Sequence, residues 1–152
     1  MQNVTLNTQR LYVKNVSYES SDTPQSFREQ GRPENSVEMR INRNNLAEEN
    51  HHEVVLILTV TTKIGDKTLC TTKAEQAGVF KVENASEEQL DQILNIHCSH
   101  VLYPYACNAI SQLTVMGSLP AIVLQPVDFN GLYQQRKEAE KEKPDDSKRT
   151  IH

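Results

Sequence analysis

The sequence predicts an α+β protein in which four antiparallel strands come first and helices follow on one side of the sheet. Two observations support this fold class. From Val4 to Phe80 apolar residues repeatedly alternate with polar ones, as in strands whose two faces differ. After Ser86 the apolar spacing changes to three and four residues, the period of a helix. We expect one domain at residues 1–135, followed by a charged, disordered tail at residues 136–152.

Alternation defines the expected strands. In the first, apolar residues occur on both faces, which a bulge would explain. Gly65-Asp66 marks a hairpin turn between the last two strands. A long segment, residues 19–35, is rich in turn-formers and carries Phe27; loops of this length are often functional. The expected strands are residues 4–18, 37–41, 53–62 and 68–74, the last extended by Val79 and Phe80, and a meander in chain order is the simplest sheet.

Capping signals delimit the helices. Ser86 and Gln89 form a capping box, and Pro104 is placed to begin a second helix. Gly117 and Pro120 end that helix. Asp128 is expected to cap a short C-terminal helix that presents three apolar residues on one face, namely Phe129, Leu132 and Tyr133.

The segment Tyr105–Met116 contains no charged residue. A helix that is apolar nearly all round must be covered nearly all round, and in a domain this small another subunit can cover one side. The helix could instead line a pocket for a hydrophobic ligand. Its small residues Ala106, Cys107 and Ala109 allow close helix approach and favour the interface.

Composition excludes several classes of function. The net charge of −4 offers no excess of cations for nucleic acid. No apolar run approaches the roughly 20 residues that span a bilayer, and the N-terminus lacks the pattern of a secretory signal. The cysteines Cys70, Cys98 and Cys107 have no metal-like spacing. We therefore expect a cytoplasmic protein without cofactor or metal.

The cluster His97-Cys98-Ser99-His100 is the strongest chemical candidate. A small α+β enzyme could use Cys98 with His97 or His100, and the two histidines could share a metal. No acidic partner or third ligand lies nearby in the sequence, and cysteine on an apolar helix is commonly a core residue. The structural interpretation is favoured.

A series of short motifs resembles the SecB protein-export chaperones. In the second half these are Leu102-Tyr103-Pro104-Tyr105-Ala106, Gly117-Ser118-Leu119-Pro120 and Leu124-Gln125-Pro126-Val127-Asp128-Phe129. Upstream, Gln76-Ala77-Gly78-Val79-Phe80 is similar to the end of the family's fourth strand, and Gln9-Arg10-Leu11-Tyr12-Val13-Lys14 to its first. Phe27 and Pro33-Glu34 match its crossover loop. The order and spacing hold over residues 4–133.

The resemblance implies a homotetramer, a dimer of dimers, that acts as an ATP-independent holdase. It would bind unfolded precursor proteins in apolar grooves and deliver them to the translocase SecA. The implied groove residues are Phe27, Val37, Met39, Ile41, Phe80, Phe129, Leu132 and Tyr133. The implied oligomer interface comprises Tyr105, Ala106, Cys107, Ala109, Ile110, Leu113 and Thr114, with Thr72, Ala74 and Gln76.

The chain departs from the family on the face that docks SecA. Glu19 matches a family carboxylate, but Asn15 and Lys73 stand where the family usually has acids. Loss of negative charge should weaken attraction to a basic partner. Gly31 replaces a groove tryptophan. Because SecB-like chaperones also serve toxin–antitoxin pairs, a chaperone dedicated to one partner such as an antitoxin is the alternative.

Overall fold

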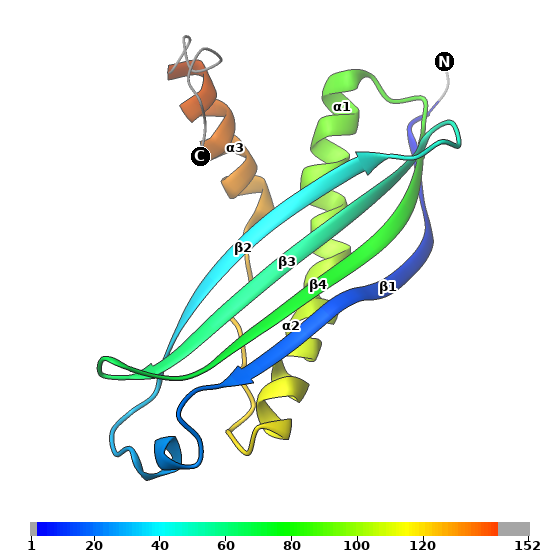
Figure 1. Ribbon diagram of the computed structural model, residues 1–152. Helices are drawn as coiled ribbons and strands as arrows, with labels where there is room; N and C mark the ends of the chain where they lie inside the picture. Colours follow the sequence, from blue (N-terminus) through cyan, green and yellow to red (C-terminus); the bar gives the residue numbers. More distant parts are fainter. Residues whose placement is uncertain (1–2, 143–152) are drawn as a thin grey trace.

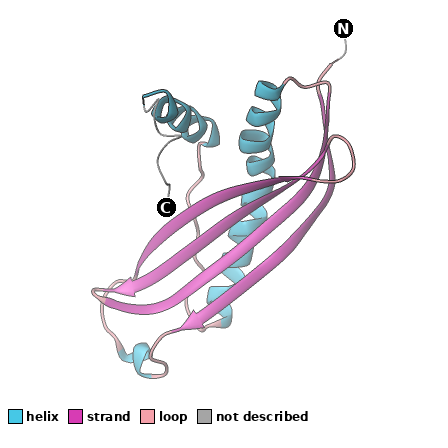
Figure 2. Ribbon diagram, turned by 45° about the horizontal axis from the view of Figure 1, so that its top comes forward, coloured by secondary structure: helices cyan, strands magenta, loops and turns pink. Residues whose placement is uncertain are grey.

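The computed structural model describes residues 3–142, which form a four-stranded antiparallel sheet with its helices on one face (Figures 1 and 2). The helical run after the sheet crosses its back obliquely, and the last helix stands beside the β2 edge (Figure 1). The elements are β1 (Thr5–Ser20), a 3-10 helix (Gln25–Arg28), β2 (Glu34–Asn45), β3 (His51–Ile64), β4 (Lys67–Glu83), α1 (Glu87–Gln92), a π-helical segment (Ile93–His97), α2 (Cys98–Met116) and α3 (Phe129–Glu142). The predicted fold class is confirmed.

The order of the strands differs from the expected meander. The sheet runs β1-β4-β3-β2, so only β2, β3 and β4 follow one another as neighbours. The short connections around Leu46–Asn50 and Gly65-Asp66 keep those strands adjacent. The segment between Ser20 and Glu34 is long enough to cross the roughly 14 Å between the two edges of the sheet. The meander was wrong because periodicity carries no information about which strands pair.

Strand β1 contains the bulge that its pattern suggested. Its pairing with β4 shifts between Thr8 and Arg10 and again between Val13 and Asn15. Each shift exchanges the faces, so Leu6 and Leu11 both pack against the helix-side core although one has an even number and the other an odd one.

The helical run from Glu87 to Met116 passes through Pro104 without a break. The Ser86–Gln89 capping box is present at its start. A proline inside a helix costs about 3 kcal/mol, yet Leu102 and Ile110 are fully buried against the sheet. Burying each such side chain contributes roughly 1.5–3 kcal/mol, so packing outweighs the lost hydrogen bond. The expectation that Pro104 begins a new helix was wrong.

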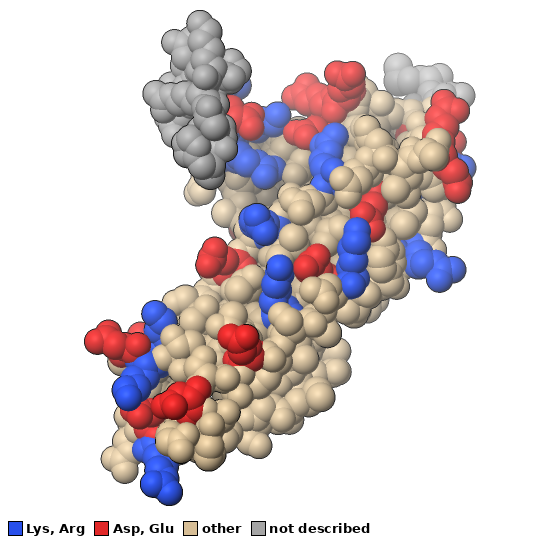
Figure 3. All heavy atoms as spheres, in the orientation of Figure 1, with Lys and Arg blue, Asp and Glu red and all other residues tan. Residues whose placement is uncertain are grey.

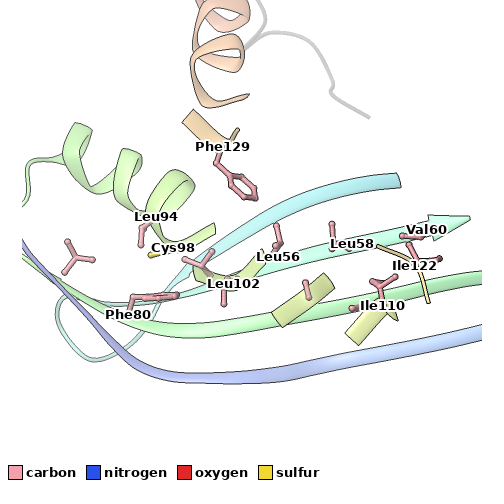
Figure 4. Packing of buried hydrophobic residues seen from close by; sticks show 14 residues of the cluster. Leu56, Leu58, Val60, Phe80, Leu94, Cys98, Leu102, Ile110, Ile122 and Phe129 are labelled. Carbon is pink, nitrogen blue, oxygen red and sulfur yellow. The ribbon is translucent and has the colours of Figure 1, made fainter. Parts of the chain in front are cut away.

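The core lies between the helices and alternate residues of the two central strands (Figure 4). Strand β4 contributes Phe80, and the helices contribute Leu94, Cys98 and Leu102. From β3 the contributors are Val54, Leu56, Leu58 and Val60, all with no exposed surface.

The C-terminal helix begins where Asp128 predicted. The Asp128 Oδ1 accepts a hydrogen bond of 3.0 Å from the Gly131 N–H. α3 then runs across the expected domain boundary at residue 135 and reaches Glu142. The rest of the expected tail, residues 143–152, lies outside the described residues.

Within residues 3–142, the helices fall short of the length and apolarity that crossing a membrane requires.

Candidate functional site

A groove runs between β2 and α3 on the helix side of the sheet. It consists of two adjoining cavities of about 450 and 360 Å³ that share Met39 and Leu132, and we call it the β2–α3 groove. The first cavity is lined by Val37, Met39, Leu58, Tyr103, Pro126, Val127, Asp128, Gly131, Leu132 and Gln135. The second adds Arg40, Ile41, Asn42, Asn95, Phe129, Tyr133 and Arg136.

Four of the expected groove residues are accessible in this groove. Val37 is 48% exposed and Leu132 45%, and Met39 and Ile41 are half-buried between them. Val37, Met39 and Ile41 share one face of β2, because they pair opposite Val60, Leu58 and Leu56 of the core face of β3. The structure therefore brings together residues that the sequence placed far apart.

Three other expected groove residues are buried. Phe80 is 0% exposed, Phe129 2% and Tyr133 4%. The Phe129 ring packs edge-on against His100 and Tyr103, with ring centroids 5.0 and 5.6 Å away. Phe129 and Tyr133 form the inner wall of the groove, whereas Phe80 belongs to the core beneath the π-helical segment and α2. Leu132 is therefore more accessible from the groove than either aromatic ring.

Sequence reasoning missed Tyr103, Pro126 and Val127 as lining residues. They lie in the motifs that carried the resemblance, but alternation and helical spacing give no sign that they line a cavity. Tyr103 donates a hydrogen bond of 2.6 Å to the Gln125 carbonyl. This bond ties α2 to the segment that leads into α3.

Phe27 lies apart from these residues, on the crossover between β1 and β2. It is 53% exposed and borders a cavity of about 190 Å³. A further cavity of about 290 Å³ shares Pro33, Leu69 and Leu119 with it and reaches Asn35. Because Asn35 and Val37 are alternate residues of β2, the hollows follow one another along this strand.

Gly31 corresponds to a position where the family often has a tryptophan. Its backbone conformation favours glycine. Its φ is +130°, and an added Cβ would lie 2.9 Å from the Ile64 Cγ2. A side chain at this position would need both a different backbone and a displaced Ile64.

Asp91 on α1 joins three elements. Its Oδ1 lies 2.6 Å from Arg43 of β2, and its Oδ2 accepts a hydrogen bond of 2.5 Å from the Tyr133 hydroxyl of α3. Lys137 lies 3.3 Å from the same carboxylate. Arg136 donates a hydrogen bond of 2.9 Å to the Asn95 side-chain oxygen. The Asn95 amide nitrogen in turn donates a hydrogen bond of 3.1 Å to Asp91. We call these residues the Asp91 network.

Charge and hydrogen bonding determine the ionisation of Asp91. Burial by itself would raise its pKa, but hydrogen bonds from Tyr133 and Lys137 and the charges of Lys137 and Arg43 outweigh it, so the pKa lies below its ordinary value. The carboxylate is therefore ionised at neutral pH. The charged tail was expected to begin at residue 136, but Arg136 and Lys137 belong to α3. Arg136 is held by a hydrogen bond to Asn95 and Lys137 by its charge pair with Asp91.

Among residues 3–142, no helix covers the opposite face of the sheet, and the charges on this face are mixed (Figure 3). Asn15 lies opposite Glu75, with its amide 3.4 Å from that carboxylate. Lys73 lies 3.5 Å from the same carboxylate, and Glu19 is further along β1. The three expected docking residues share this face. Lys73 offsets the negative charge of Glu75, and the neutral Asn15 adds no negative charge beside it.

A second cluster on this face centres on Glu53. Tyr12 donates a hydrogen bond to its carboxylate, and Lys14 lies 2.9 Å away. Burial, the hydrogen bond and the negative charge of Glu53 raise the pKa of Tyr12 to about 12.

The surface of α2 divides into a buried side and an outer side. Six expected interface residues are buried beneath or against the sheet: Ala106, Ile110, Thr114, Thr72, Ala74 and Gln76. They lie between α2 and the sheet, because α2 packs on β3 and β4. In the described chain they are therefore not accessible to another subunit. Tyr105 is 52% exposed, Met116 is 80% exposed, and Cys107, Ala109 and Leu113 are half-buried. On the neighbouring margin of the sheet, Val13 and Val16 of β1 are 53% and 40% exposed.

The structure argues against Cys98 as a nucleophile. Its side chain is fully buried in the core, and burial raises the pKa of its thiol to about 12. His97 and His100 are exposed while the thiol faces the sheet. A neutral, inaccessible thiol is unreactive.

The comparisons with known proteins agree with this architecture. Residues 1–140 match the model of a family described as "Preprotein translocase subunit SecB". "Protein-export protein SecB" of Hahella chejuensis is 40% identical over 84% of this chain and 79% of its own length. The protein of that name from Neisseria meningitidis is 39% identical over 87% of this chain and 90% of its own.

One solved structure is similar in fold. It is the SecB-like chaperone of Mycobacterium tuberculosis in complex with a ChAD peptide from an antitoxin. Its TM-score is 0.66 with 16% sequence identity, over 80% of this chain and 90% of the other.

Replacing Asp91→Asn should loosen α3 without unfolding the sheet. Losing charged hydrogen bonds at this partly exposed position should cost about 1–2 kcal/mol, which corresponds to roughly tenfold faster amide exchange in α3. Because the folded pKa of Asp91 lies below its ordinary 3.8, the network should persist as pH falls to that value and be lost at lower pH. Hydrogen exchange resolved by segment measures both effects.

The matched control is Glu88→Gln, an exposed acid on the same helix. Equal exchange of α3 in both variants would contradict a specific role for Asp91.

Proposed function

Because the chain belongs to the SecB family, we propose that it is an ATP-independent holdase that binds unfolded precursor proteins and keeps them competent for export. The observation that supports this most directly is the β2–α3 groove, whose apolar residues are accessible from solvent. A fold that serves a holdase needs long apolar surface rather than one shaped pocket. The series of hollows along β2 fits that need.

The binding energy comes from many weak contacts. Each apolar side chain of a client removes apolar surface from water at about 25 cal/mol per Å². One such contact is weak, but contacts repeated along one unfolded chain multiply through effective concentration. Specificity then depends on how much apolar extended chain a client exposes.

The proposed assembly is a tetramer, and the outer side of α2 supports it. Tyr105, Val115 and Met116 present apolar surface there, beside the exposed Val13 and Val16 of β1. Covering this region with another subunit would remove these apolar side chains from water.

We place the protein in the cytoplasm and propose SecA as its export partner. The three cysteines are free thiols, which suits a reducing compartment. The mixed charge around Glu75 predicts weaker attraction to a basic SecA segment than an acidic face would give.

A second candidate function is a chaperone dedicated to one partner. The similar solved structure, a SecB-like chaperone holding an antitoxin peptide, favours it. Pull-down from the native cytosol separates the two: many unfolded precursors for the first function, one abundant partner for the second.

Leu132→Glu should impair client binding. A buried charge replaces an apolar contact that is worth roughly 1.5–3 kcal/mol, so the affinity for an unfolded client should fall at least about tenfold. Suppression of client aggregation, followed by light scattering, measures this. Leu46→Glu is the control, since Leu46 is 39% exposed and lies outside the groove. If both variants suppressed client aggregation equally well, the β2–α3 groove would not be the client-binding site.

Static light scattering should give about four times the chain mass of 17.3 kDa at micromolar concentration. Met116→Glu should lower this mass, because it introduces charge into the proposed interface. Val123→Glu should leave it unchanged, since Val123 is 84% exposed but lies after α2. A monomeric parent protein would count against the assembly.

Restoring acids on the open face should strengthen SecA binding. The variant Asn15→Asp with Lys73→Glu should bind the C-terminal zinc-binding segment of SecA about tenfold more tightly at low salt, with a smaller gain at high salt. Titration calorimetry measures it. The charge-matched control is Asn7→Asp with Lys81→Glu, a facing pair elsewhere on the same two strands. An equal gain in both would indicate attraction by net charge alone.

A further inference from the structure

The helix-side face of β2 changes from apolar to polar at one point. Val37, Met39 and Ile41 line the β2–α3 groove, whereas Arg43 and Asn45 continue the same face of the strand with polar side chains. Beside these polar residues lies a further cavity of about 670 Å³, which we call the α1–α3 cavity. It is bounded by the end of β2 and by α1 and α3, which diverge behind the sheet (Figure 1).

The Asp91 network lies between this cavity and the groove. Arg43 of β2 and Lys137 of α3 both pair with Asp91 of α1, at 2.6 and 3.3 Å. The Tyr133 hydroxyl donates a hydrogen bond to the same carboxylate, and Tyr133 lines both the groove and the α1–α3 cavity. The network therefore joins three elements across the line that the groove would follow along β2, and the apolar hollows end there.

One carboxylate holds two cations in this network. The negative charge of Asp91 offsets the repulsion between Arg43 and Lys137, so removing or screening that charge leaves two cations that repel each other. The three side chains are 30–43% exposed, and solvent therefore weakens each pair. A connection of this strength can break while the sheet stays folded.

A buried amide supports the carboxylate. Asn95 belongs to the π-helical segment and is 8% exposed. It donates a hydrogen bond to the Asp91 carboxylate and accepts one from Arg136 of α3. Turns of this kind are frequent at functional sites. The helix that carries Asp91 therefore also fixes the direction of its side chain toward α3.

We propose that the Asp91 network is an ionic gate at the end of the β2–α3 groove. While the network is paired, it confines a bound unfolded segment to the apolar part of the groove. When the charge of Asp91 is removed or screened, α3 separates from Arg43 and the groove continues into the α1–α3 cavity. Asp91 is thus a positioning residue that determines how long a client segment one chain covers. This inference rests on the proposed function and adds a limit to it.

A simple brace for α3 predicts a different result. Losing a brace would loosen the whole helix, so contact with a client would change on both sides of α3. Opening a gate changes client contact only on the side of the α1–α3 cavity.

Two adjacent residues of α3 report the two hollows separately. Gln135 lines the groove and Gln134 lines the α1–α3 cavity, and both are exposed. The photo-crosslinking residue benzoylphenylalanine replaces one or the other in the full chain. The probe is a reduced and alkylated protein that stays unfolded, and the captured probe is quantified on a gel after irradiation.

The parent chain at low salt should capture the probe mainly at Gln135. Asp91→Asn should raise capture at Gln134 at least about fivefold and change capture at Gln135 by less than about twofold. Retained capture at Gln135 also shows that the variant is folded. The matched control is Glu88→Gln, an exposed acid that lines the α1–α3 cavity outside the network, and it should behave as the parent does.

Ionic strength provides an independent measurement. Raising the salt concentration from about 0.05 to 1 M shortens the range of charge interactions from about 14 to 3 Å. Capture at Gln134 in the parent chain should then rise toward that of Asp91→Asn. The variant should show no such rise, because its gate is already open.

Two kinds of result would contradict the proposal in different ways. Equal capture at Gln134 in the parent and Asp91→Asn chains, or a rise at both positions, would overturn the gate and leave the groove in place. Absence of capture at Gln135 in the parent chain would overturn the proposed client site together with the gate.

Discussion

A single helix is too narrow to cover this sheet, and most features of the molecule follow from that mismatch. α2 is about 10 Å across, whereas the two outer strands of the sheet lie about 14 Å apart. It packs over β3 and β4, where Leu102 and Ile110 are fully buried. The helix-side face of both outer strands therefore extends beyond it. On β1 this leaves Val13 and Val16 exposed, and on β2 it leaves Val37, Met39 and Ile41 for other elements to cover.

α3 covers the β2 margin only in part, and polar contacts rather than a deep apolar core anchor much of it. Phe129 is held between α2 and the sheet, but beyond Tyr133 the helix is attached through the Asp91 network. Exposed charge pairs contribute little free energy, whereas hydrogen-bonded, partly buried ones contribute more. α3 is thus attached to the rest of the molecule at Phe129 and through the Asp91 network, and Leu132 stays accessible between these contacts.

The two faces of the sheet suit different partners. The helix side offers apolar surface beside β2, which is an edge strand of the sheet. The open side carries mixed charge, in which Lys73 offsets Glu75 and Asn15 is neutral. Under the proposed function, an unfolded client and a folded partner would therefore bind to separate faces of the sheet.

The sequence by itself determined what depends on local and periodic patterns. Alternation located the strands, the Ser86–Gln89 pair marked the helix start, and Asp128 marked the start of α3, because each rests on residues within a turn or two of one another. The family resemblance implied a groove that contains Val37, Met39 and Leu132, and these three residues line one cavity. Tertiary structure alone decided the pairing of β1 with β4, the continuation of α2 through Pro104 and the burial of Phe80, Phe129 and Tyr133. It also assembled Arg43, Asp91 and Lys137 into one network. These outcomes depend on contacts between residues distant in the chain, whose free energies no local pattern records.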